Sequence, residues 1–253
     1  MVNSGATLSL GSDIATNGTM TITGTARLFD YVISGTGTFT ANAATTVLYI
    51  GHADGINLVA SGAIGNIQTS VRNFGTTGQF IYNGTVAQST GTGLAASVTT
   101  ASITIDNASG VSLTQNTSIT GAGSLTLSSG RLRLGSSNFT LGATAQLLGA
   151  PFGVNNMVVT DGSGQLINIS GTSAFSFTYP VGDETGTPEY SPITFNFLVN
   201  SAARTIGVRA VNTQHPNNFG GTPNYLDRYW AITQPAMATI THLKSRMNTR
   251  QPT

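Results

Sequence analysis

Apolar residues recur in short clusters along most of the chain, and residues 110–149 show the pattern most clearly. Within a cluster the apolar residues lie two positions apart, as in Leu125/Leu127 and Leu132/Leu134, which places both on one face of a β-strand. Clusters follow one another at intervals of about six to eight residues, and glycine, serine, asparagine and threonine favour turns between them. About three clusters, or roughly twenty residues, would make one coil of a parallel β-helix.

The fold class predicted for residues 1–150 is therefore an all-β parallel β-helix, or solenoid, which we expect to be right-handed. The inward positions expected along its stacked coils include Leu125, Leu127, Leu132, Leu134, Phe139 and Leu141.

The pattern changes near Pro151, where the predicted strands lengthen and prolines and aromatic residues become more frequent. Long strands joined by turn-rich loops are typical of a β-sandwich, so we expect an Ig-like β-sandwich over residues 151–253. From Ala236 the alternation fades and a basic tail follows, which suggests a sandwich that is short of strands. Three basic residues fall in that tail, namely Lys244, Arg246 and Arg250.

The amino-acid composition favours some classes of protein over others. Only 8% of the 253 residues are charged, against the usual quarter, while 39% are hydrophobic. There is no cysteine, and Lys244 is the single lysine. Such a composition is typical of secreted bacterial surface repeats and unusual for a cytosolic enzyme. The N-terminus begins inside the repeat pattern without the basic and apolar segments of a signal peptide, so we expect a mature piece or a fragment of a longer secreted protein.

The spacing of the carboxylates along the sequence does not favour a catalytic site. The four acids of residues 1–150 are spread widely and none lies two positions from another, so each is expected at a solvated turn. The densest acidic group is Asp183, Glu184 and Glu189. A Ca²⁺-binding loop is one interpretation of this group, and we favour the other, a polar hairpin loop.

Other signatures of chemistry are weak. His52, His215 and His242 are far apart, and without cysteine they do not predict a zinc site. Residues 91–96 match G-x-G-x-x-A, but no helical pattern follows. No G-x-S-x-G motif occurs. We therefore predict no catalytic residue, no cofactor and no metal.

Two groups of side chains are candidate contacts for a glycan. Arg131 and Arg133 alternate with leucines, so both should point outward from one strand, where they could meet an anionic sugar; a solvated face is the interpretation that we favour. Tyr225 and Trp230 offer rings that stack on sugars, or alternatively a core tryptophan. Two arginines do not make the basic stripe that nucleic-acid binding requires, and no run of eighteen apolar residues predicts a transmembrane helix.

Several motifs in this order resemble long secreted surface proteins of Bacteroidota-type bacteria. The motifs lie at residues 82–94, 103–113, 125–132, 175–183, 190–192 and 226–230. The resemblance implies an exported, adhesin-like protein, usually without known enzymatic activity, that leaves the cell by the type IX secretion route. Nothing in the sequence matches the C-terminal sorting domain that such cargo carries.

We therefore expect a non-enzymatic structural or adhesin-like segment, located outside the cell or on its surface, whose partners are glycans or the surfaces of host or neighbouring cells. The alternative is a β-helix polysaccharide lyase or hydrolase, or its glycan-binding module, which would need two acids about 10 Å apart in a groove. A third interpretation is end-to-end self-association, because solenoid ends without caps expose strand edges.

Overall fold

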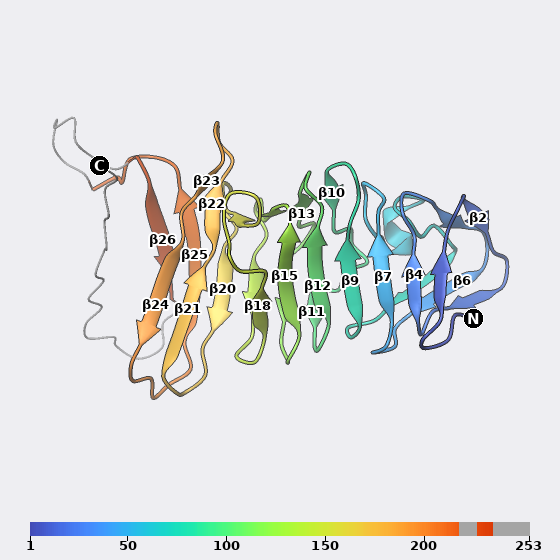
Figure 1. The fold of residues 1–253 in the computed structure, drawn as a ribbon, viewed down its shortest axis with the longest axis horizontal. Coiled ribbons are helices and arrows are strands. Elements are labelled where there is room, and N and C mark those ends of the chain that lie inside the picture. Colours follow the sequence, from blue (N-terminus) through green and yellow to red (C-terminus); the bar gives the residue numbers. More distant parts are fainter. Residues whose placement is uncertain (218–226, 235–253) are drawn as a thin grey trace.

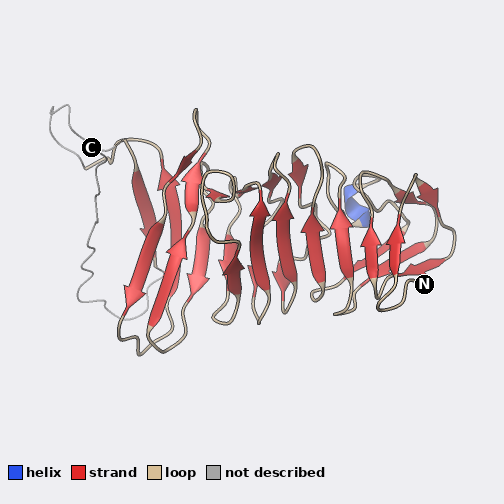
Figure 2. Cartoon of the chain, viewed as in Figure 1, coloured by secondary structure: helices blue, strands red, loops and turns tan. Residues whose placement is uncertain are grey.

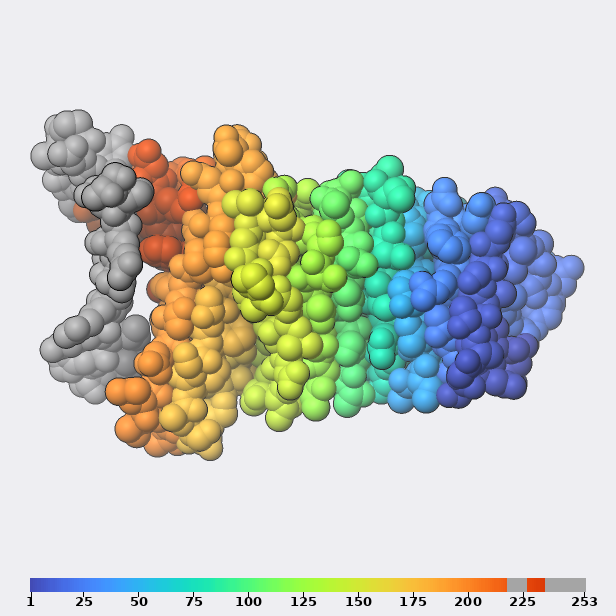
Figure 3. Space-filling view, in the orientation of Figure 1, coloured from blue at the N-terminus to red at the C-terminus, as the bar shows by residue number. Residues whose placement is uncertain are grey.

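The computed structural model describes residues 1–217 and 227–234. The chain is all-β, with 41% of its residues in strands and 1% in helix, and it forms a β-solenoid of about 8 turns. Figure 1 shows the coils following one another along the long axis, with the N-terminus at one end. The space-filling view has the same order, since the colours pass as successive bands from one end of an elongated body to the other (Figure 3).

One long parallel sheet runs through the first seven levels of the solenoid. In this sheet, hereafter the long sheet, Ile103 lies opposite Leu125 and Leu125 opposite Leu147, so one coil advances by 22 residues. In order, its strands are β1 (Thr7–Ser9), β4 (Thr25–Arg27), β7 (Val47–Ile50), β9 (Gln79–Tyr82), β12 (Ser102–Asp106), β15 (Ser124–Ser129) and β18 (Gln146–Leu148).

Shorter sheets close the other sides of the coils. Near the N-terminus these are β2 (Ile14–Ala15) with β5 (Ile33–Ser34), and β3 (Thr19–Thr21) with β6 (Thr38–Ala41) and β8 (Val71–Phe74). Further along, one sheet contains β10 (Gln88–Ser89), β13 (Val111–Ser112), β16 (Leu132–Arg133), β19 (Val158–Val159), β22 (Val181–Asp183) and β23 (Glu189–Tyr190). The other contains β11 (Ser97–Val98), β14 (Thr117–Ile119), β17 (Phe139–Leu141), β20 (Leu166–Ile169), β25 (Thr205–Val211) and β26 (Tyr229–Thr233).

The interior of the coils is the hydrophobic core. The predicted inward positions are confirmed, because each of the six is at most 1% exposed: Leu125, Leu127, Leu132, Leu134, Phe139 and Leu141. Every second residue of a strand points into this core, so stacked coils bury continuous rows of apolar side chains.

Parallel pairing continues past residue 150, where the sequence suggested a new domain. β16 pairs in parallel with β19, β17 with β20, and β19 with β22. Antiparallel pairs also occur in this part of the chain, between β20 and β25, β25 and β26, β22 and β23, and β21 (Phe175–Tyr179) and β24 (Ile193–Phe197). Two of the sheets thus continue past the expected boundary, whereas the long sheet ends at β18, just before it. The Ig-like sandwich is not confirmed, and the basic tail from Ala236 lies outside the described residues.

One coil carries an insertion. Leu48 on β7 lies opposite Phe80 on β9, an advance of 32 residues instead of 22. The extra residues fall in a loop over residues 51–70, which contains the short 3-10 helix η1 (Val59–Ser61), the single helical segment in the described part of the chain (Figure 2).

Among the residues with described structure, there is no helix with the length and apolar character needed to cross a membrane.

Candidate functional site

The two arginines expected to contact a glycan are paired with a carboxylate. Arg131 Nη1 donates to Glu184 Oε1 over 2.7 Å, and Arg133 Nε donates to Glu184 Oε2 over 2.6 Å. Arg133 Nη2 adds a bond of 3.1 Å to Glu184 Oε1. Burial raises the pKa of Glu184, but hydrogen bonds and charges from Arg133 and Arg131 outweigh it and bring the pKa below its ordinary value. The arginines therefore offer an anionic ligand much less positive charge than two free guanidinium groups would.

A hollow of about 240 Å³ lies beside this ion-pair cluster. Its lining combines one side of Arg131 with small and polar residues, namely Ala108, Ser129, Gly130 and Asn155. None of these lining residues carries a carboxylate that could act as a general acid or base.

The acidic residues of segment 183–189 contact arginines in two different places. Asp183 is fully buried, its Oδ2 lies 3.2 Å from Arg228 Nη2, and Glu189 contacts the same guanidinium. Glu184 faces the other way, toward Arg131 and Arg133. Across residues 1–217 and 227–234, no group of three or more histidine, aspartate or glutamate side chains is arranged to hold a metal ion. β22 and β23 form the antiparallel hairpin that was the favoured interpretation of this segment.

The surroundings of Trp230 are those of a core residue rather than those of an exposed ring that could stack on a sugar. Its Nε1 donates to the Ser191 carbonyl over 2.8 Å, and the half-buried ring packs against the hydrophobic core. Tyr225 falls outside the described residues. Of the side chains that the sequence suggested for glycan contact, the structure therefore pairs Arg131 and Arg133 with Glu184 and packs Trp230 against the core.

Two of the three histidines have local roles. His52 Nδ1 and His215 Nδ1 each accept a backbone N–H from two residues further on, Asp54 and Asn217 respectively. His242 is outside the described residues. The glycine segment 91–96 leads into the strand β11 rather than a helix, as a dinucleotide site would need.

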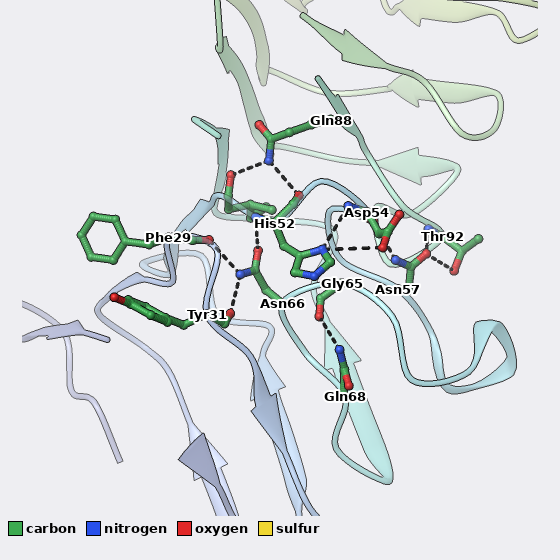
Figure 4. Close-up of polar contacts among 11 residues, drawn as sticks. Phe29, Tyr31, His52, Asp54, Asn57, Gly65, Asn66, Gln68, Gln88 and Thr92 are labelled. Atoms are coloured by element: carbon green, nitrogen blue, oxygen red, sulfur yellow. Dashed lines mark hydrogen bonds and ion pairs between the residues drawn. The ribbon is translucent and has the colours of Figure 1, made fainter. Parts of the chain in front are cut away.

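The inserted loop contains a polar network that sequence inspection missed (Figure 4). Asn66 is fully buried, and its Nδ2 donates to the carbonyls of Phe29 (2.9 Å) and Tyr31 (2.7 Å). Its Oδ1 accepts the backbone N–H of His52. One side chain thus joins the inserted loop to a turn of the preceding coil.

Other side chains anchor the rest of the loop. Arg72 is 8% exposed and donates to the carbonyls of Asn57, Leu58 and Thr69, and burial lowers its pKa. Asn57 Oδ1 accepts the backbone N–H of Thr92. The loop is therefore fixed at several points by hydrogen bonds to backbone groups.

The turn that Asn66 holds presents aromatic side chains. The rings of Phe29 and Tyr31 meet edge to face with centroids 6.4 Å apart. Two residues before Phe29, the Arg27 guanidinium lies over the Tyr49 ring at 3.9 Å. The alternation of apolar residues did not predict these aromatic side chains, because Phe29 lies at a position where the pattern predicts a turn.

Comparison with known proteins finds no matching family model, curated protein or solved structure. A function can therefore be proposed only from the sequence, the fold and the side chains of this protein. The resemblance to Bacteroidota surface proteins remains a prediction.

Proposed function

We propose that this chain is a non-enzymatic structural segment of an extracellular or cell-surface protein, with an adhesin-like role as a rigid spacer. The observation that carries this proposal is the uninterrupted long sheet, in which seven parallel strands stack in register. A solenoid of this kind holds its two ends at a fixed separation, because each coil contacts its neighbours through a complete ladder.

The outward side chains of the long sheet support a role at a hydrated surface. Ser102 and Ser124 lie in register, and their hydroxyls hydrogen-bond over 3.1 Å, although Ser124 itself is buried. Thr104 and Thr126 follow two residues further along. Such ladders are polar without being charged, and a long face of this type can make many weak contacts whose effects combine.

Export and location are proposed on composition and resemblance. The scarcity of charge, the absence of cysteine and the ordered motifs are typical of secreted bacterial surface proteins. Passage through the type IX route is part of the same proposal.

The first coil supports self-association with a second copy. Four of its apolar side chains remain partly exposed, whereas their partners on the next coil are fully buried. The pairs are Val2 with Ile22, Leu8 with Ala26, Ile14 with Ile33 and Met20 with Phe39. β1 lies at the edge of the long sheet and carries no charged residue to block pairing. A two-fold axis would set two copies of β1 antiparallel and cover both apolar ends.

The non-enzymatic role is tested by incubating the protein with plant, algal and bacterial polysaccharides and measuring new reducing ends. We expect no release above a heat-denatured control. Reproducible cleavage that is lost in Asp54→Asn or Glu184→Gln would contradict the proposal and favour the β-helix enzyme.

A further inference from the structure

Phe29 adopts a backbone conformation that its side chain disfavours. Its φ is +51°, and it is the one non-glycine residue with a positive φ in the part of the chain that the structure describes. At the turns directly after β15 and β18 the corresponding conformation is taken by glycines, Gly130 and Gly149. A bulky residue in the left-handed region is destabilising, so its presence here needs a compensating reason.

Neighbouring segments hold this conformation in place. Asn66, from the inserted loop, binds the carbonyls on either side of the turn, at Phe29 and Tyr31. Gly51 packs so closely on the next coil that a Cβ there would lie 2.2 Å from the Phe29 carbonyl oxygen. Groups from a different coil therefore hold the turn, together with its own hydrogen bond from the Tyr31 N–H to the Leu28 carbonyl.

This conformation exposes an aromatic pair. Phe29 is 46% exposed and Tyr31 is half-buried. Figure 4 shows both rings projecting to the same side, away from the Asn66 amide. The exposed Asp30 stands between them in the sequence. The turn thus carries two aromatic rings and an exposed carboxylate on a backbone that hydrogen bonds hold in place.

We propose that Phe29 and Tyr31 form a glycan-binding site, in which the apolar C–H face of a pyranose ring stacks on Phe29. The Tyr31 hydroxyl and the Asp30 carboxylate, from the same turn, would then hydrogen-bond the sugar hydroxyls. A pyranose fits this platform better than a protein does, because two rings offer far less area than the roughly 1,000 Å² that a specific protein interface buries. The inference rests on the proposed surface role and gives it a ligand class.

The test uses the strain at Phe29 to separate binding from stability. Phe29→Gly removes the ring and relieves the positive φ, so we expect the melting temperature to be unchanged or higher. Isothermal titration with cellohexaose, chitohexaose, mannohexaose and hexagalacturonate should show binding of at least one by the unaltered protein. Phe29→Gly should weaken that binding about tenfold or more, whereas Phe29→Trp should retain it.

Val86→Ala is the matched control, because Val86 is an exposed apolar residue (55%) outside the turn. It should bind the same oligosaccharide as the unaltered protein. The proposal is overturned if none of the four oligosaccharides binds, if Phe29→Gly binds normally, or if Phe29→Gly lowers the melting temperature, which would mean that the ring supports the fold. None of these results bears on the stacking of the coils, so the spacer role would stand or fall separately.

Discussion

Leu134 shows how strongly a single inward position constrains the solenoid. Its side chain is 1% exposed and lies in the core between stacked coils. We expect Leu134→Asp to reduce the free energy of unfolding by about 3–5 kcal/mol, because an unpaired carboxylate would be buried. Chemical denaturation measures this loss, with Ser128→Asp as the control on an exposed position of β15. Equal losses in the two variants would mean that the assignment of faces is wrong.

Glu184 makes a prediction about pH. Its pKa in the folded protein lies below the ordinary value of 4.5, because Arg133 and Arg131 favour the charged form. The stability that it contributes is therefore fully present above about pH 4.5 and lost as the pH falls through the lower, folded-state pKa.

Glu184→Gln should lower the free energy of unfolding by about 1–3 kcal/mol at pH 7, and the difference from the unaltered protein should shrink on acidification. Unfolding curves at a series of pH values measure this difference. A difference that stays constant down to pH 3 would show that the ion pairs do not carry the effect.

At the scale of elements, the inserted loop depends on Asn66. Asn66→Ala would leave the Phe29 and Tyr31 carbonyls and the His52 N–H without their partner. We expect a loss of about 2–4 kcal/mol in the free energy of unfolding, measured by denaturation. Asn17→Ala is the control, since Asn17 is exposed and accepts one bond from Thr36. If both variants lose the same stability, the Asn66 network does not anchor the loop.

Some elements could be predicted from sequence and others could not, for reasons that these residues make clear. The inward leucines of β15 and β16 follow from alternation, because a strand buries every second side chain whatever its neighbours are. The same alternation does not say which strand lies alongside, so β19, β20 and β22 were assigned to a sandwich although they continue the solenoid. Asn66 was missed because its partners lie 35 and 37 positions away. Likewise, alternation with leucines predicted that Arg131 and Arg133 point away from the core, but Glu184, more than fifty positions away, could not be foreseen as their partner.

At the scale of the whole molecule, the N-terminal end should be a contact between copies. We expect sedimentation velocity to show a dimer that forms with rising protein concentration. Leu8→Lys would place a charge among the partly exposed apolar residues and shift the protein to monomer. Val86→Lys alters an exposed apolar residue elsewhere and should leave the dimer intact. A monomer at all concentrations, or equal dimerisation of the two variants, would rule out this contact.

A continuous solenoid requires coils that stack in parallel register through and beyond residue 150. Thr140 on β17 lies opposite Ile167 on β20, and neither side chain is buried. Because the chain has no cysteine, the pair Thr140→Cys/Ile167→Cys can be tested for a disulfide without interference. Neighbouring strands lie about 4.8 Å apart, within the range that a disulfide spans, whereas Ile169 is two positions out of register.

The most direct measurement is therefore disulfide formation on mild oxidation, followed by mass spectrometry of the folded protein. The stacked solenoid predicts a bond in Thr140→Cys/Ile167→Cys and none in the out-of-register control Thr140→Cys/Ile169→Cys. A bond that forms in the control and not in the registered pair, or in neither, would contradict a continuous solenoid across residue 150.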